Sequence, residues 1–179
     1  SYGYADFALE LLDSSGQTLA ASEDAIGFDP LIDHVVSRDG DYLVRVTLLN
    51  FGGFPEAVYR LTLGEVPFVT GCFPSGVRRG VETEVELFGP NVPPGARQKV
   101  LASKDSTFPM AYVVYAGAAT SGADVPLAVG EFLESVETEP NDSRETAQSA
   151  PFETTINARF DRPDDVDWYR VTLAEKQRV

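Results

Sequence analysis

The stretch Glu82-Thr-Glu-Val-Glu-Leu-Phe88 alternates polar and apolar side chains, residue by residue. Successive side chains of a β-strand point to opposite faces of a sheet. The stretch therefore predicts a strand that turns Thr83, Val85 and Leu87 to a core and its glutamates to solvent. The pair Gly89-Pro90 ends the strand, because proline cannot donate to a β-ladder.

Similar strand patterns extend in both directions from this stretch. We expect strands at residues 7–12, 17–21, 31–36, 42–49, 58–63, 99–102, 111–115, 125–129 and 168–173, separated by turns rich in Gly, Pro, Asp and Ser. No helix longer than about two turns is predicted anywhere in the chain. The expected fold class is all-β. Since a β-sandwich takes roughly 100 residues, the 179 residues make at most two folded units.

The chain is strongly acidic. It has 14 basic and 28 acidic side chains, a formal net charge of −14. This charge repels nucleic acid and anionic membranes, so neither is expected as a partner. No run approaches the ~18 consecutive apolar residues of a membrane span, so no membrane insertion is expected. No signal peptide begins the chain, but its start at Ser1 lacks an initiating methionine and does not argue for the cytoplasm.

Two short runs concentrate oxygen donors, namely Glu137-Thr-Glu-Pro-Asn-Asp142 and Asp164-Asp-Val-Asp-Trp-Tyr169. Pro140 fixes its own φ and favours extended backbone at Glu139, so the first run is presented from stiff, non-helical chain. If the two runs pack side by side, up to six oxygen-bearing side chains converge. Ca²⁺ prefers such ligands. The alternative is a solvated acidic linker that leads into a polar turn.

The patterns Glu-x-Glu-Pro-Asn-Asp and Asp-x-Asp-Trp-Tyr resemble the opening half of the bacterial pre-peptidase C-terminal (PPC) domain. That domain is a secreted β-sandwich found behind the catalytic domains of extracellular peptidases. Its closing half resembles the other end of this chain, at Leu9–Ala20, Asp29-Pro30, Asp39–Val46 and Tyr59–Leu63. The resemblance implies that residues 1–65 are the C-terminal half of a jelly-roll-like PPC sandwich and that residues 136–179 are the N-terminal half.

Calcium is the cofactor that this resemblance implies, because calcium-binding members of the family take their ligands from the two acidic runs. The corresponding residues here are Glu137, Glu139, Asn141, Asp142, Asp164 or Asp165, and Asp167. A divalent ion would hold these carboxylates ionised beside one another. We expect the role of the ion to be structural.

Residues 66–135 are expected to form a separate domain between the two halves. The run from Pro67 through Phe73-Pro-Ser-Gly76 to Gly89 resembles the start of an immunoglobulin-like β-sandwich of the IPT/TIG type. Neither PPC half can close a core alone, because a half-sandwich leaves strand edges and an apolar face in water. We expect residues 153–173 to complete the sheets of residues 7–63, within one chain or in a domain-swapped dimer. A fragment of a longer repetitive protein is the competing explanation.

No enzyme active site is expected. Hydrolytic triads need a base, and the single histidine, His34, lies in a predicted strand where a packed or solvated role is common. Cys72 is expected to be a small buried side chain. The chain is therefore expected to be a non-catalytic accessory or binding module of a larger secreted or surface protein, outside the cell or at its surface. Its expected partners are an extracellular polymer, either protein or polysaccharide, or an attached catalytic domain.

Two alternatives to an accessory module remain. One is a fragment of a secreted peptidase or glycosidase whose active site lies elsewhere or is unrecognised, and the other is a structural or adhesin-type spacer. The ligand itself is not predicted. Some aromatic side chains either stack on a sugar or peptide or belong to the core, namely Tyr2, Tyr4, Tyr112, Tyr115 and Trp168.

Overall fold

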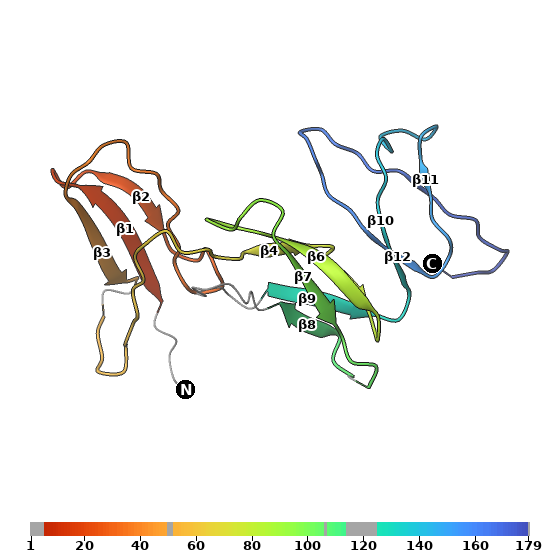
Figure 1. Ribbon diagram of the computed structural model, residues 1–179, viewed down its shortest axis with the longest axis horizontal. Coiled ribbons are helices and arrows are strands. Elements are labelled where there is room, and N and C mark those ends of the chain that lie inside the picture. The colour runs from red at the N-terminus through yellow and green to blue at the C-terminus, as the bar shows by residue number, and fades with distance from the viewer. Residues whose placement is uncertain (1–5, 50–51, 106, 114–124, 179) are drawn as a thin grey trace. The chain divides into compact units, whose positions relative to one another are not determined.

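The computed structural model describes residues 6–49, 52–105, 107–113 and 125–178. All regular secondary structure in these ranges is β-strand, which confirms the predicted all-β fold (Figure 1). The chain divides into two compact units between Glu65 and Val66. In the residues so described, no helix is present that could cross a membrane.

The first unit holds an antiparallel sheet of three strands in the order β2-β1-β3. These strands are β1 (Phe7–Asp13), β2 (Thr18–Ser22) and β3 (Tyr42–Leu48). The Oδ1 atom of Asp13 accepts hydrogen bonds from the backbone N–H groups of Ser15 and Gln17, at 2.8 and 3.0 Å, and so closes the turn between β1 and β2. The predicted hairpin is confirmed.

The sheet of the first unit buries little apolar surface. Among residues 6–49 and 52–65, Leu12 is the one hydrophobic side chain that is buried, at 7% exposure. In β3, by contrast, Leu43 and Val44 are 55% and 37% exposed. Because neighbouring residues of a strand point to opposite faces, apolar side chains are exposed on both faces of this sheet.

Two strands predicted for the first unit do not form. Residues 31–36 and 58–63 belong to no β-ladder, and Val35 and Val58 are 90% and 79% exposed. Both predictions were wrong. Alternating side chains fit a pleated surface, but a strand also needs a neighbouring strand to satisfy its backbone N–H and C=O groups.

Two sheets of three strands build the part of the second unit between residues 66 and 130. The first, in the order β4-β6-β7, is antiparallel and consists of β4 (Gly71–Phe73), β6 (Glu82–Phe88) and β7 (Arg97–Leu101). In the second, β9 (Val125–Gly130) lies parallel to β5 (Gly76–Arg78) and antiparallel to β8 (Met110–Val113). The strands predicted around residues 99, 111 and 125 correspond to β7, β8 and β9, but residues 114–115 lie outside the described ranges.

Both sheets contribute side chains to one hydrophobic core. Val85 of β6, Val77 of β5 and Leu127 of β9 are completely buried in it, at 0% exposure. The glutamates of β6 lie on the opposite face, where Glu84 accepts a hydrogen bond from Arg97 of β7 at 3.0 Å. The alternation predicted for residues 82–88 is confirmed.

Residues 131–178 continue the second unit with two short parallel pairs of strands. In the first pair β10 (Leu133–Val136) lies beside β12 (Thr154–Asn157), and in the second β11 (Gln148–Ser149) lies beside β13 (Tyr169–Arg170). The strand expected through residues 168–173 is thus only two residues long.

The pairing of β12 with β10 and of β13 with β11 is internal to the second unit. The sheet of β1, β2 and β3 is likewise internal to the first unit. The division into domains at residues 65 and 135, and the completion of residues 7–63 by residues 153–173, stay predictions.

Candidate metal site

The two acidic runs meet at the start of β13. The backbone N–H of Trp168 donates to the carbonyl oxygen of Asn141 at 2.9 Å, and the N–H of Gln148 donates to the carbonyl of Trp168 at 2.9 Å. These bonds hold the segment after β10 beside the segment that enters β13. Residues 20 and 27 positions apart in sequence therefore become neighbours, as expected for parallel pairing across a crossover.

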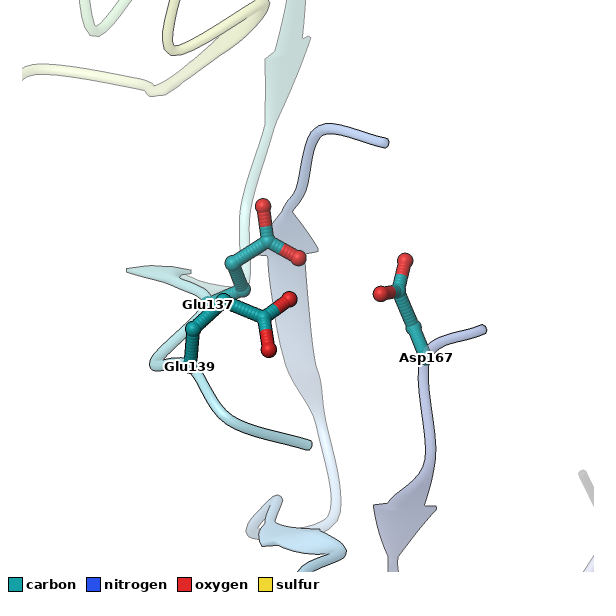
Figure 2. Close-up of side chains that lie close together, drawn as sticks. All are labelled: Glu137, Glu139 and Asp167. Carbon is teal, nitrogen blue, oxygen red and sulfur yellow. The ribbon is translucent and has the colours of Figure 1, made fainter. Parts of the chain in front are cut away.

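Three carboxylates converge at this meeting point, those of Glu137, Glu139 and Asp167. Each offers one oxygen, and these oxygens all lie within 4.8 Å of one another. Figure 2 shows the carboxylates of Glu137 and Glu139, on one segment, turned toward that of Asp167 on the other. Three of the seven predicted ligands are therefore brought together by the fold.

Asn141 adjoins this cluster and is completely buried, at 0% exposure. Its backbone N–H donates to Oε2 of Glu139 at 2.8 Å. The oxygen of its side-chain amide has no hydrogen-bond partner in the protein, and Oδ1 of Asp167 is also buried without one. Buried polar atoms are normally satisfied, so these atoms point to a ligand that the protein chain does not supply.

Burial and the neighbouring carboxylates both disfavour the charged form of Glu137. Burial raises the pKa of Glu137, and the nearby charges of Asp167, Glu139 and Asp161 raise it further. A hydrogen bond from the backbone N–H of Arg159 to the Glu137 carboxylate acts in the opposite direction and lowers this pKa. The carboxylates thus repel one another, and a divalent cation between them would remove that repulsion.

The phenol of Tyr169 closes one side of the cluster. Its hydroxyl donates to Oε2 of Glu137 at 3.4 Å. Burial raises the pKa of Tyr169, and the charges of Asp167 and Glu137 add to the rise, whereas the neighbouring amide of Asn141 lowers it. Tyr169 therefore stays a neutral hydrogen-bond donor to the carboxylates, a role that the sequence did not suggest.

The donor set fits a hard cation. Ca²⁺ takes about 6–8 oxygen ligands, from carboxylates, amide carbonyls, backbone carbonyls and water. Glu137, Glu139 and Asp167 would supply carboxylate oxygens, and the unpartnered amide oxygen of Asn141 would be a fourth protein ligand. Zinc prefers histidine and cysteine ligands, which this group does not contain.

The remaining three predicted ligands do not belong to the cluster of Glu137, Glu139 and Asp167. Asp142 forms an ion pair with Arg162. Asp165 accepts a hydrogen bond from the backbone N–H of Asp161 at 2.7 Å, and its other oxygen lies 3.5 Å from Arg162. Asp164 is exposed and has a left-handed φ of 63°. The geometry does not place these acids in the cluster of Glu137, Glu139 and Asp167, and their assignment as ligands stays a prediction.

Other side chains singled out by the sequence lie outside the cluster. Tyr112 and Trp168 are 58% and 44% exposed and available for stacking, whereas Tyr2, Tyr4 and Tyr115 lie outside the described residues. His34 is exposed in the first unit. Cys72 is buried in the core of the second unit, and burial raises the pKa of its thiol.

An open cleft of about 340 Å³ borders the cluster, and Phe73, Glu86 and Arg159 line it together with Glu137. No motif marked Arg159 or Asn157 beforehand, yet both connect the cluster to the strands of residues 66–130. Neither residue carries a local sequence signal for this role, because burial cannot be read from sequence alone.

Comparison with known proteins gives no further assignment. Neither a scan against protein-family models, nor a search of curated proteins, nor a search of solved structures finds a match for this chain. The resemblance to PPC and IPT/TIG domains therefore stays a prediction. What carries the functional proposal is the geometry of Glu137, Glu139, Asn141 and Asp167.

Proposed function

We propose that this chain is a non-catalytic accessory module of a larger secreted or surface protein, and that calcium stabilises it. One observation carries the proposal: three carboxylates from two separate acidic runs converge within 4.8 Å. The buried amide oxygen of Asn141, which has no hydrogen-bond partner, supports a cation as the missing partner. The resemblance of both runs to PPC modules points to the same ion.

A structural role for the ion fits its surroundings better than a catalytic one. Glu137, Asn141 and Asp167 are all part-buried or buried, and their segments are joined by backbone hydrogen bonds rather than spread around a deep pocket. An ion there would join the chain after β10 to the chain before β13. Extracellular modules bind calcium with dissociation constants of about 10⁻⁴–10⁻³ M, which suits a location outside the cell.

The partners that we propose are an extracellular polymer, protein or polysaccharide, or a catalytic domain in the same protein. The exposed rings of Tyr112 and Trp168 offer flat apolar surfaces on which a sugar or peptide could stack. Stacking of this kind needs no reactive group. The module would thus hold a polymer or a neighbouring domain without changing it chemically.

Thermal unfolding of the full chain with and without calcium tests the proposal. A cation that binds only the folded state stabilises it by about 2.7 kcal/mol at a hundredfold excess over the dissociation constant. We expect 10 mM CaCl₂ to raise the melting temperature by about 3–8 °C relative to EDTA. Magnesium should raise it less, because Mg²⁺ requires near-ideal octahedral geometry.

Two matched variants locate the effect. Asp167→Asn should remove most of the calcium-dependent shift, because it deletes one carboxylate of the cluster. Asp105→Asn makes the same change at an exposed residue of the second unit that is not a predicted ligand, so the shift should persist. Equal melting temperatures in calcium and in EDTA for the unmodified chain would contradict the proposal.

A further inference from the structure

The segment that ends β12 attaches the acidic cluster to the strands of residues 66–130. It does so through two residues, Asn157 and Arg159, which we call the clamp residues. Both lie in the second unit, as do the strands that they contact. Neither is among the residues that would hold the cation.

Asn157 is the more deeply buried clamp residue, at 4% exposure. Its Oδ1 accepts hydrogen bonds from the backbone N–H groups of Ser75 and Gly76, both at 3.0 Å, where β5 begins. Its Nδ2 donates to Oε2 of Glu134 in β10 at 2.7 Å. One side chain therefore satisfies two backbone donors at the start of β5 and one carboxylate of β10, in a site with little access to water.

Arg159 contacts the neighbouring antiparallel sheet. Its guanidinium carbon lies 3.9 Å from the centre of the Phe73 ring and 5.8 Å from that of Phe88. Its Nη2 donates to Oε2 of Glu86 at 3.2 Å. The side chains of Arg159 and Glu86 are 39% and 42% exposed, so solvent screens their ion pair, and the stacking on Phe73 is the main contact.

Glu137 links both clamp residues to the cation site. Its backbone N–H donates to the carbonyl oxygen of Asn157 at 2.9 Å, and its carboxylate accepts from the backbone N–H of Arg159. Val136 is paired with Asn157 in the parallel ladder of β10 and β12. The position of the Glu137 carboxylate therefore depends on the same backbone that positions Asn157 and Arg159.

We propose that cation binding at Glu137, Glu139 and Asp167 is coupled to docking of the clamp residues on β4, β5 and β6. This inference rests on the proposed calcium site. With the cation present, Glu137 is held in place and keeps its bond to Arg159. Without it, repulsion from Glu139 and Asp167 favours movement of Glu137 and loosens the clamp residues. The cluster would thus control how firmly two parts of the second unit are joined.

Coupling between two sites is reciprocal, which makes the proposal testable from either side. Cation binding should stabilise the contacts of the clamp residues, so calcium should slow hydrogen exchange at the Ser75 and Gly76 amides at least about fivefold. Substitutions that weaken the contacts of the clamp residues should in turn lower the affinity for the cation. The residues changed for that purpose carry no predicted ligand atom.

Terbium luminescence measures the cation affinity, because Tyr169 lies against the cluster and can sensitise a bound Tb³⁺ ion. Asn157→Ala leaves the net charge of the chain unchanged. It should lower terbium affinity about fivefold or more, as expected for a coupling of ordinary size. Thr155→Ala changes an exposed residue of the same strand and should leave the affinity unchanged. Far-UV circular dichroism establishes that each variant is folded.

A second pair of variants keeps the test independent of Asn157. Arg159→Lys retains the positive charge near the cluster but loses the flat guanidinium that stacks on Phe73, so terbium affinity should also fall. Arg97→Lys makes the same exchange at the exposed ion pair with Glu84 and serves as its control.

The outcomes separate the two proposals. If the wild-type chain does not bind terbium or calcium, the proposed function fails, and the coupling fails with it. If the wild type binds but folded Asn157→Ala and Arg159→Lys bind equally well, the calcium site stands and the coupling is overturned. Calcium-independent exchange at Ser75 and Gly76 in a chain that binds calcium would also overturn the coupling.

Discussion

Gly89 lies so close to Phe68 that a Cβ atom at position 89 would stand 2.0 Å from the Phe68 carbonyl oxygen. The same atom would stand 2.8 Å from the backbone nitrogen of Thr70. Both neighbours are backbone atoms of a segment that bonds to the end of β6, with the Thr70 N–H donating to the Phe88 carbonyl at 3.0 Å. No side-chain rotation can relieve such an overlap.

Gly89→Ala is therefore expected to destabilise the second unit by more than about 2 kcal/mol, because it adds a clash to an unfavourable φ of +149°. Gly95→Ala is the control: its φ of +74° is also positive, but nothing lies within 4 Å of the added atom. Urea unfolding should show the larger loss for Gly89→Ala. Equal losses in the two variants would show that the close approach to Phe68 is absent.

The hydrogen bonds of the turn after β1 lower the pKa of the Asp13 carboxyl group. Hydrogen bonds from the Ser15 hydroxyl and from the Gln17 and Ser15 backbone N–H groups lower the pKa of Asp13, and the charge of Arg38 contributes. We expect the Asp13 carboxyl to titrate below its ordinary value of about 3.9 in an NMR pH titration. Ser15→Ala should raise the titration midpoint, because it removes the largest contribution, whereas Ser14→Ala should not move it.

The sign of the linked stability follows from the direction of this shift. A pKa that is lower in the folded state means that the ionised Asp13 favours the hairpin at every pH above the ordinary value of about 3.9. The contribution is lost as the pH falls through the depressed folded-state pKa. A midpoint at or above the ordinary value would contradict the hydrogen-bonded turn.

Cys72 is expected to resist thiol reagents in the folded chain. It is 7% exposed in the core, and burial raises the pKa of its thiol, so the reactive thiolate is both scarce and inaccessible. Ellman's reagent at pH 8 should label Cys72 only as fast as the second unit opens. Unfolding in urea should expose the thiol and make the labelling fast. Rapid labelling in native buffer would mean that β4 is not packed as described.

The raised pKa of Cys72 also predicts how stability changes in alkali. The neutral thiol is preferred in the folded state, so its contribution is complete below the ordinary thiol pKa of about 8.5. It is lost as the pH rises through the higher folded-state value. Cys72→Ala should remove this part of the alkaline loss of stability.

The sequence predicted the strands whose two faces differ in polarity. In β6 the alternation of glutamates with Val85 and Leu87 was sufficient, because one face meets a core and the other meets water. Residues 59–63 show a comparable pattern, in which Tyr59, Leu61 and Leu63 alternate with Arg60 and Thr62, yet they form no ladder. The pattern specifies which side chains prefer burial, but it does not specify whether a neighbouring strand is present to accept them.

The sequence likewise predicted only part of the candidate site. The two acidic runs were expected to meet, and Glu137, Glu139 and Asp167 do meet. Which acids face the shared point depends on local pairing that the sequence does not reveal, such as the ion pair that Arg162 forms with Asp142. The clamp residues depend on tertiary contacts across about 80 positions of sequence and carry no local signal.

The open sheet of β1, β2 and β3 has a consequence for how the first unit holds together. With Leu12 as the only buried apolar side chain in residues 6–49 and 52–65, the sheet has almost no interior of its own. A sheet of this kind gains most of its hydrophobic stabilisation from whatever covers it. Folding of the first unit is then coupled to association of the sheet with the surface that covers it. By mass action, the melting temperature of the first unit rises with the concentration of that surface.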